Sequence, residues 1–442
     1  MSPTHVDALP PGRSGLPLLG ETLEFAKNPF AFIDRRLAAH GRVFRTHLLG
    51  RPTVVIAGPD AAGNFIDSER VMRAGSMPAN IEALFAGKSL PLLDGDQHRA
   101  RKSIVLQGFS RAALDAYLPT LQAIVERGFA GWVAAGEVRW LDELKRLAIE
   151  GICATVIGME PGDEMDRLRR DYDTLTAAFA ALPIDLPGTR YRNALRARDR
   201  LLAVLSRLVK ERRARPTDDG LSRMLQARTA DGVALSDEQA VLELHHVVIA
   251  GYIVFAELAM IVQQLTAQPE VCTRLAEEVR RLAAGGPLRL EDLVAMTYLR
   301  QVVMETKRVC PIIPAIFGKA KVSFDVDGLR VPEGWMVLWA VLPTHTTCSL
   351  YSEPARFDPG RFSAERAEDR RHEHAFVPQG AGPAIGHRCP GLDFATLLMQ
   401  VFTIVLLRGF DWELPPQSLG LDYRPTPPVP IDGLRARIRA RE

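Results

Sequence analysis

Cysteine is scarce in this sequence, and the few cysteines present form none of the usual groupings. The 442 residues contain five cysteines, at positions 153, 272, 310, 348 and 389, with no Cys-x-x-Cys pair and an odd total. Neither a disulfide framework nor a zinc module is therefore expected. This usage fits a protein of the reducing cytosol, and we expect a cytoplasmic location.

An excess of charge of one sign and a long uncharged apolar run are also missing. The formal net charge is +2, which gives no reason to expect a nucleic acid or another polyanion as a partner. No run of 18 or more uncharged apolar residues occurs, and the N-terminus lacks a signal-peptide pattern, so we expect no membrane span. The most apolar stretch, residues 247–265, still contains Glu257 and two glutamines and is interpreted as a buried core helix.

Helical spacing of apolar residues dominates the first two thirds of the chain. It predicts helices at residues 28–39, 111–135, 141–157, 189–213, 237–267, 269–284 and 290–309. Strand patterns are short and pair residues 43–49 with 53–57 and residues 321–329 with 335–340. Residues 351–374 are expected to be an ordered but irregular coil, and residues 413–432 are expected to form loops and edge strands. No repeat or flexible linker divides the chain. We therefore expect a mainly α protein with one domain, residues 1–442, and a small β lobe mainly at residues 43–57 and 321–340.

Cys389 lies in a glycine-rich loop, residues 376–391, directly before an apolar segment with helical spacing. Glycines let a backbone approach a flat or bulky object, and a helix N-terminus stabilises a thiolate. This arrangement suits a cysteine that binds a metal cofactor through one bond. The residues alone leave two other interpretations open: a buried structural cysteine, or a nucleophile with His387 as its base, although a separation of two residues suits such a pair poorly.

Two further polar patterns accompany the cysteine loop. Glu305 and Arg308 share one face of a predicted helix whose apolar neighbours indicate burial, and Arg361 would supply a second guanidinium for the same carboxylate. His98 and Lys102 lie on a basic helix face, which is either a solvated surface or a site that binds carboxylates.

Taken in order, these segments resemble the cytochrome P450 family over essentially the whole chain. The resemblance implies a haem-thiolate fold, haem b as the cofactor and Cys389 as its axial ligand. It also implies that Glu305, Arg308 and Arg361 form the family's structural triad. The other cofactor-site residues that it implies are His98, Lys102, His387 and Gly391. The sequence of the cysteine loop is similar to that of the fatty-acid peroxygenase branch. The other segments are similar to soluble bacterial members and to the retinoid- and sterol-oxidising branches.

The central helix departs from the family pattern at the acid and alcohol that route protons to bound dioxygen. Ala250 and Gly251 are present, but Ile253 replaces the acid and Val254 replaces the threonine. Neither side chain can donate a proton, and the Arg-Pro pair of the peroxygenase branch is absent as well. No catalytic side chain is therefore assigned on this distal helix. Either substrate or water supplies the proton, or the protein uses peroxide or rearranges a pre-oxidised substrate. His246 shares a face with Ala250 and is either a satisfied core residue or a group near the haem.

Two smaller departures concern the haem itself. Gly318 stands where the family often has an arginine that holds a propionate, with Lys319 and Lys321 as nearby substitutes. Gly382 occupies the place of the phenylalanine that shields the thiolate, which predicts altered hydrogen bonding to the sulfur and an altered redox potential.

The resemblance also implies an apolar substrate pocket and a set of partners. The residues expected to line the pocket are Ile81, Leu84, Phe85, Leu90, Phe179, Tyr252, Ile313 and Ile316. A lipophilic, medium to large substrate follows, such as a secondary metabolite. We expect a monomer that receives electrons from a ferredoxin and its reductase unless it is driven by peroxide. Arginines in residues 364–371, with Arg388, form either a basic docking patch or solvated coil.

The leading functional hypothesis is therefore a haem-thiolate monooxygenase of lipophilic small molecules. A peroxide-using or isomerising haem enzyme is the first alternative. A non-catalytic scaffold is the second, and the retention of Cys389, His98 and Arg308 argues against it.

Overall fold

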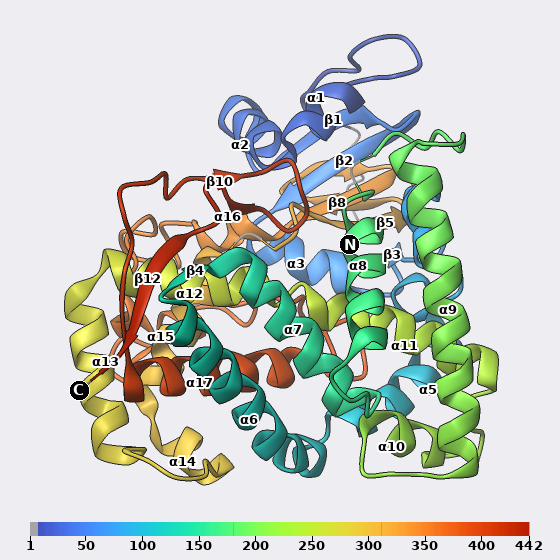
Figure 1. The fold of residues 1–442 in the computed structure, drawn as a ribbon. Coiled ribbons are helices and arrows are strands. Elements are labelled where there is room, and N and C mark those ends of the chain that lie inside the picture. The colour runs from blue at the N-terminus through green and yellow to red at the C-terminus, as the bar shows by residue number, and fades with distance from the viewer. Residues whose placement is uncertain (1–7, 180, 311, 442) are drawn as a thin grey trace.

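The computed structural model describes residues 8–179, 181–310 and 312–441, and helices make up most of it (Figure 1). The expected domain of residues 1–442 also includes residues 1–7, 180, 311 and 442, which lie outside the described residues. The helices are α1 (Thr22–Lys27), α2 (Pro29–His40), α3 (Pro59–Ile66), α4 (Ala79–Leu84), α5 (Gly95–Val105), α6 (Arg111–Ala135), α7 (Trp140–Val156), α8 (Asp163–Thr176), α9 (Arg190–Ala214), α10 (Gly220–Gln226), α11 (Asp237–Tyr252), α12 (Phe255–Ala267), α13 (Pro269–Leu282), α14 (Leu290–Ala295), α15 (Thr297–Val309), α16 (Val341–His345) and α17 (Leu392–Gly409).

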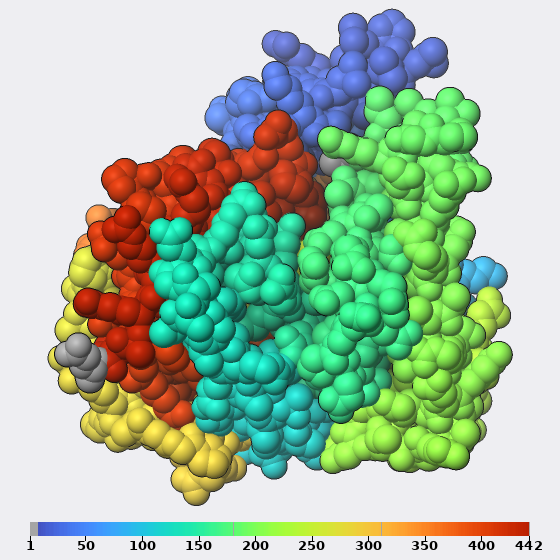
Figure 2. Space-filling view, viewed as in Figure 1, coloured from blue at the N-terminus to red at the C-terminus, as the bar shows by residue number. Residues whose placement is uncertain are grey.

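The helices enclose a large apolar core, and the N-terminal lobe lies against one end of it. Core residues come from α6, α7, α11, α12, α15 and α17. Figure 2 shows α6 to α9 covering the viewed face, with the N-terminal lobe above them. The stretches Asp237–Ala267 and Leu392–Gly409 are long and apolar enough to cross a membrane, but 83% and 72% of their most apolar windows are buried inside the protein. Both stretches are therefore core helices of this fold.

The β lobe contains the expected strands near residues 43–57, but its second half is arranged differently from the prediction. The main sheet has the order β1 (Val43–Leu48), β2 (Arg51–Ala57), β8 (Met336–Ala340), β5 (Ile316–Ala320) and β3 (Val71–Met72). The smaller strands are β4 (Glu137–Arg139), β6 (Phe324–Val326), β7 (Leu329–Val331), β9 (Phe410–Glu413), β10 (Leu421–Asp422), β11 (Val429–Pro430) and β12 (Arg435–Ala440).

The predicted pairing of residues 321–329 with 335–340 is wrong. β8 pairs with β5 and β2, whereas β6 and β7 form a separate hairpin. The reason is the two-residue turn Asp327–Gly328, in which both residues have positive φ angles of 51° and 74°. An Asp-Gly pair favours this tight turn because its backbone twist matches that of the flanking strands.

The predicted helix over residues 237–267 is interrupted between α11 and α12, at Ile253 and Val254. Here the N–H of Val254 bonds to the carbonyl oxygen of Gly251 at 3.4 Å, and the N–H of Ala256 bonds to that of Ile253 at 3.1 Å. Both bonds span three residues instead of four, which is a local tightening of the helix. Two consecutive β-branched residues after a glycine weaken the regular helix at this point. The helix predicted over residues 290–309 is likewise divided into α14 and α15.

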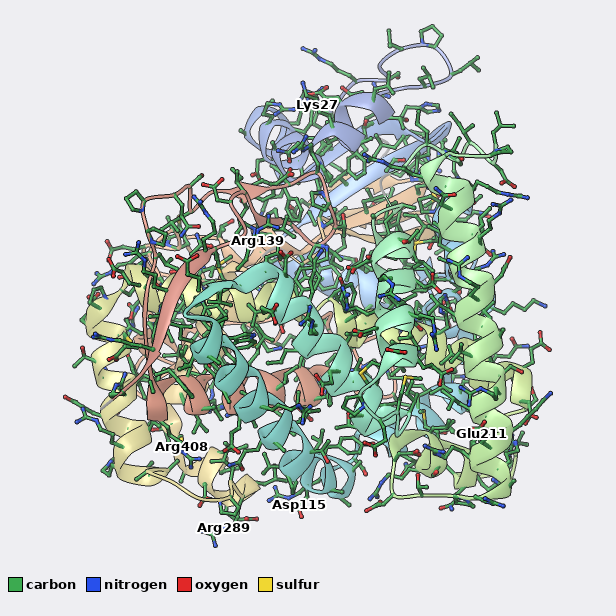
Figure 3. The ribbon with its side chains drawn as sticks, viewed as in Figure 1. Lys27, Asp115, Arg139, Glu211, Arg289 and Arg408 are labelled. Atoms are coloured by element: carbon green, nitrogen blue, oxygen red, sulfur yellow. The ribbon has the colours of Figure 1, made fainter. Side chains whose placement is uncertain are left out.

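A buried ion cluster joins α15 to the irregular segment that follows α16. Glu305 accepts hydrogen bonds from Arg308 at 2.7 and 2.8 Å and from Arg361 at 3.1 Å, and all three side chains are fully buried. The backbone N–H of Asp358 donates a further bond to Glu305 at 2.8 Å. By contrast, the charged residues Asp115 and Arg289, which are labelled in Figure 3, lie at the lower edge of the molecule in that view. The predicted contact of one carboxylate with two guanidinium groups is present.

Glu368 is a fourth member of this cluster that the sequence analysis missed. It is buried and binds Arg361 at 2.9 Å, and Arg366 and Arg371 contact its other oxygen at 2.9 and 3.2 Å. Burial alone would raise the pKa of Glu368, but these partners lower it to about 2. Because Arg366 and Arg371 bind acidic groups of the same chain, they contribute little to a free basic docking patch.

His345 connects this cluster to the cysteine loop. Its carbonyl oxygen accepts a bond from Arg308 at 2.8 Å, and its ring nitrogen Nε2 accepts one from the N–H of Val377 at 3.0 Å. Burial, together with the nearby Arg308 charge, lowers the pKa of His345 to about 3. Burial lowers the pKa of His245 on α11 to about 4. Both rings are therefore neutral in the folded protein at every pH above these values.

These histidines predict a loss of stability in mild acid. Between pH 6.5 and the lowered pKa values of about 3 and 4, the unfolded chain binds protons that the folded chain does not. The free energy of unfolding should therefore fall as the pH drops below 6.5, by about 1.4 kcal/mol per pH unit for each histidine. Urea unfolding from pH 7.5 to 4.5 measures this slope. His345→Gln retains an acceptor for Val377 and should reduce the slope by about one proton, and an unchanged slope would contradict the assignment.

Candidate haem-thiolate site

Cys389 lies at the end of a tightly folded loop, directly before α17. The loop turns at Gly380 and Gly382, which both have φ angles of 87°, a conformation that favours glycine. The N–H of Cys389 bonds to the carbonyl oxygen of Gln379 at 3.0 Å. Gly391 is the N-cap of α17, and its N–H is directed to the Cys389 sulfur. The loop therefore brings the sulfur to the start of a helix, as the sequence predicted.

The sequence predicted a stabilised thiolate at Cys389, but the groups around the sulfur act on its pKa in both directions. Burial raises the pKa of the Cys389 thiol, while the Gly391 N–H, Lys102 and Lys307 act in the opposite direction. The helix N-terminus and the two ammonium groups therefore do not outweigh the effect of burial on the pKa of the Cys389 thiol. A coordinated metal ion would displace its proton, because metal ligation requires the thiolate.

The interpretation of Cys389 as a nucleophile with His387 as base finds no support in the geometry. The His387 ring stacks on His98 with centroids 3.9 Å apart, and its Nε2 lies 3.5 Å from Asp94. Among the described residues, no hydrogen bond joins His387 to Cys389. His387 is therefore oriented toward α5 and away from the sulfur.

A cluster of basic groups surrounds Asp94 beside this loop. Burial and then the His387 charge lower the pKa of His98 to about 3. Arg73 is buried as well, and its backbone N–H donates to both oxygens of Asp94 at 3.0 and 2.8 Å. The His387 side chain contacts Asp94, and the His98 ring stacks on His387. The Arg73 guanidinium acts electrostatically on both rings, and nitrogen donors of this kind suit carboxylate groups.

Lys102 contacts the loop backbone instead of this cluster. Its ammonium group donates to the carbonyl oxygen of Arg388, the residue before Cys389. Burial lowers the pKa of Lys102 to about 8, while the nearby Cys389 acts to raise it. The structure therefore places Lys102 behind the sulfur and His98 beside the stacked His387.

The missing propionate arginine at position 318 has a steric explanation. A Cβ atom at Gly318 would lie 2.5 Å from Val71, so no side chain fits there. Lys321 is directed to Glu69 at 3.4 Å on the surface, and it does not take over the role. Arg73, which the sequence analysis missed, donates to the carbonyl oxygen of Phe317 at 3.0 Å and occupies this region. Its only sequence signal is a lone arginine in a short strand segment.

A second missed group lies next to the sulfur. The Gln379 side-chain nitrogen Nε2 is 3.9 Å from the Cys389 sulfur, and its oxygen Oε1 is 2.7 Å from the Lys307 ammonium. Lys307 contacts both oxygens of Glu257 at 3.3 Å. Position 382 does not reach the sulfur, since a Cβ at Gly382 would face Ile66 at 3.2 Å. A lysine on the otherwise apolar face of α15 was the available signal.

α11 and the residue that follows it carry a stripe of half-buried side chains at helical spacing. His246, Ala250 and Ile253 are half-buried at helical spacing, whereas Val254 is buried at 4% exposure. Gly251 points elsewhere, because a Cβ atom there would lie 2.4 Å from Ile152 of α7. The glycine is therefore required by helix packing, and Ala250 rather than Gly251 belongs to the open stripe.

The stripe meets apolar side chains from two other segments. Phe85, after α4, stacks on Phe179, after α8, with centroids 5.7 Å apart, and it lies 6.3 Å from the His246 ring. Neither ring nitrogen of His246 has a hydrogen-bond partner among the described residues, and its nearest acid is Glu243 at 3.7 Å. His246 is therefore not the satisfied core histidine that one interpretation expected.

The remaining pocket candidates divide into two groups. Ile81, Ile313 and Ile316 are half-buried, as residues that line a cavity are. Leu84 and Leu90 are part of the packed core. Tyr252 is also in the core, and its hydroxyl donates to Asp173 of α8. The pocket assignment therefore stays a prediction, and the half-buried residues are its better members.

The residues of this site fit a haem group. A lone, half-buried cysteine whose sulfur faces a backbone N–H suits a single bond to a metal. The nitrogen-bearing side chains near Asp94 would suit two carboxylates, and Ala250 and Ile253 of the half-buried stripe would offer apolar surface. Within the described residues, no cluster of three or more His, Cys, Asp or Glu side chains could hold a metal ion by itself, so a metal here would depend on a cofactor with its own ligands.

Comparisons with known proteins agree with this assignment. A family model described as cytochrome P450 matches residues 10–429. The putative cytochrome P450 120 of Synechocystis sp. is 32% identical over 445 residues, which is 99% of both chains. Abscisic acid 8'-hydroxylase 3 of Oryza sativa is 31% identical and covers 97% of this chain and 86% of its own length. The solved structure of retinoic acid-bound cyanobacterial CYP120A1 has a TM-score of 0.91 at 30% identity, covering 98% of this chain and 99% of its own. The chain therefore belongs to the cytochrome P450 family, whose members are oxidoreductases that bind haem.

Proposed function

We propose that this protein is a haem-thiolate monooxygenase of the cytosol that oxidises a lipophilic isoprenoid, with Cys389 as the iron ligand. The observation that carries the proposal is the position of the Cys389 sulfur, which the Gly391 N–H and the Gln379 amide both approach. When bound, haem would supply the activation of dioxygen and the insertion of oxygen into substrate. Arg73, His98 and His387 would bind its carboxylates.

The relatives and the pocket together suggest the class of substrate. Retinoic acid and abscisic acid, named with two of the similar proteins, are both isoprenoid carboxylic acids. In this chain, the Phe85 ring stacks on Phe179 and lies beside a polar group, His246, whose ring has no hydrogen-bond partner among the described residues. We infer that His246 receives the polar end of the substrate, while the apolar walls hold its hydrocarbon body.

Ferredoxin and its reductase are the expected electron donors under this proposal. Arg388 is exposed directly beside Cys389, where a positive charge would meet an acidic partner. Because Arg366 and Arg371 are already paired with Glu368, Arg388 is the stronger candidate for this contact.

The role of Cys389 is tested by the spectrum of the reduced protein with carbon monoxide. The wild-type protein should absorb at the wavelength that gives the family its name, because that band requires a thiolate ligand. Cys389→Ser should abolish the band, and Cys310→Ser serves as a matched control in the same fold. If the protein does not bind haem, or if Cys389→Ser keeps the band, the monooxygenase proposal fails and the scaffold alternative gains support.

The role of His246 is tested with an acid and its methyl ester. Retinoic acid should bind the wild-type protein about tenfold more tightly than methyl retinoate, as expected for one hydrogen bond to a charged group. His246→Phe should remove this preference and leave ester binding nearly unchanged. Titration of the haem absorption band gives both dissociation constants. A preference that survives in the variant would show that the acid is held elsewhere.

A peroxide-using enzyme is the second candidate, and a specific observation favours it. Ile253 and Val254 carry no proton donor, and α11 and α12 are interrupted at these two residues. The cysteine loop is also similar in wording to the peroxygenase branch. In peroxide, the oxygen is already reduced by two electrons and carries its protons. An enzyme that uses peroxide therefore needs fewer protons from the protein than one that reduces dioxygen.

The two candidates differ in how they respond to the oxidant and to Val254→Thr. In the introduced threonine, the hydroxyl could bond to the Ala250 carbonyl one turn earlier and would place a proton donor next to the half-buried Ile253. A monooxygenase should turn over faster with ferredoxin, reductase and NAD(P)H than with peroxide, and Val254→Thr should raise product formation per NAD(P)H about tenfold. Val262→Thr, in the core part of α12, is the control. Faster turnover with peroxide alone, with no gain in Val254→Thr, would favour the peroxide-using enzyme.

A further inference from the structure

We propose that Gln379, held by Lys307 and Glu257, donates a hydrogen bond to the Cys389 sulfur and thereby limits how strongly this sulfur donates electrons to bound iron. The inference rests on the proposed function only in taking Cys389 as the iron ligand. Gln379 is then a positioning residue for the thiolate, and Lys307 and Glu257 act through it.

The first step is the supply of hydrogen-bond donors to the sulfur. Pro390 follows Cys389 and has no backbone N–H. Of the two residues after the cysteine, only Gly391 can therefore donate from its backbone, and its N–H does face the sulfur. The Gln379 amide at 3.9 Å is the side-chain donor at the sulfur among the described residues, and it adds a second donor to the Gly391 N–H.

The second step is the orientation of the Gln379 amide. The Lys307 ammonium lies 2.7 Å from Oε1 of Gln379. An ammonium group has only donors, so the amide oxygen must face it. The amide nitrogen, which carries two hydrogens, is then directed to the Cys389 sulfur. The orientation is thus determined by chemistry and not by an arbitrary choice between oxygen and nitrogen.

The third step is the burial of the charge behind the amide. The Lys307 side chain is 3% exposed and the Glu257 side chain is fully buried, with 3.3 Å between them. A buried ion pair costs desolvation energy and is not in itself evidence of a stabilising role. A charge-assisted bond from Lys307 polarises the Gln379 amide and makes its N–H a stronger donor. The ion pair would therefore strengthen the Gln379 donor, an effect that two apolar side chains could not have.

The consequence for bound iron follows from the charge on the sulfur. A hydrogen bond withdraws electron density from a thiolate, and hydrogen bonds to the sulfur are a known means of raising the potential of a thiolate-bound metal. The loop lacks a side chain at Gly382, where the family has its shielding phenylalanine. Gln379 would limit the electron donation of the sulfur, a role that position 382 cannot have in this chain.

The test measures the iron–sulfur bond of the holoprotein directly. In Gln379→Leu, the ferric/ferrous equilibrium should shift about tenfold toward ferric iron, a fall of about 59 mV in midpoint potential. The iron–sulfur stretching frequency in resonance Raman spectra should rise at the same time. Gln263→Leu, the same change in α12 far from the sulfur, should leave both values unchanged.

A second variant tests the ion pair and guards against misfolding. Lys307→Met combined with Glu257→Leu removes both charges together, so no unpaired charge is left buried. It should lower the potential in the same direction but by less, because the amide remains and only its polarisation is lost. If Gln379→Leu changes neither the potential nor the stretching frequency, the hydrogen bond is refuted. If only the double variant has no effect, the contribution of the ion pair is refuted.

The failure of this inference and that of the proposed function are distinguishable. If the carbon monoxide band survives in Cys389→Ser, Cys389 is not the thiolate ligand, and both proposals fail. If the band depends on Cys389 but the potential is unchanged in Gln379→Leu, only the proposed hydrogen bond from Gln379 is refuted.

Discussion

The buried carboxylate of Glu305 is the interaction on which the arrangement of the site depends. Its charge is balanced by Arg308 on the same helix and by Arg361, which lies 56 residues further along the chain. Because a buried charge without its partners is strongly destabilising, the irregular segment between α16 and α17 has one favourable position against α15. His345 then extends this fixed region to the cysteine loop through the N–H of Val377.

Sequence reasoning was most successful where a function needs a fixed residue type at a fixed position. Glu305, Arg308 and Arg361 could be paired in advance because buried charges need partners. It failed where the outcome depends on distance between segments remote in sequence. Gln379 and Lys307 are 72 residues apart, and no local pattern shows that they meet. The strand pairing failed for a local reason, because the Asp327–Gly328 turn was a readable signal that was overlooked.

The interruption between α11 and α12 separates two tasks of one long apolar stretch. Before the interruption, α11 carries the half-buried side chains that the proposed function assigns to the substrate. After it, Glu257 is directed to Lys307 and the cysteine loop. Helical periodicity predicted the stretch but not its division, since Ile253 and Val254 are as apolar as their neighbours. Positions 253 and 254 thus carry no polar side chain, whereas Glu257 and Lys307, on the side of the cysteine loop, are buried and paired.

The contact between Gly251 and Ile152 also links pocket size to residues outside the pocket. α11 approaches α7 so closely that even one carbon atom on Gly251 would collide with Ile152. The position of α11 is thus limited on the side that faces α7, by the bulk of Ile152. A smaller residue at position 152 would let α11 move toward α7 and would leave more room on its half-buried face. Under the proposed function, in which that face meets the substrate, the substrate range can therefore change during evolution without any substitution in the pocket wall.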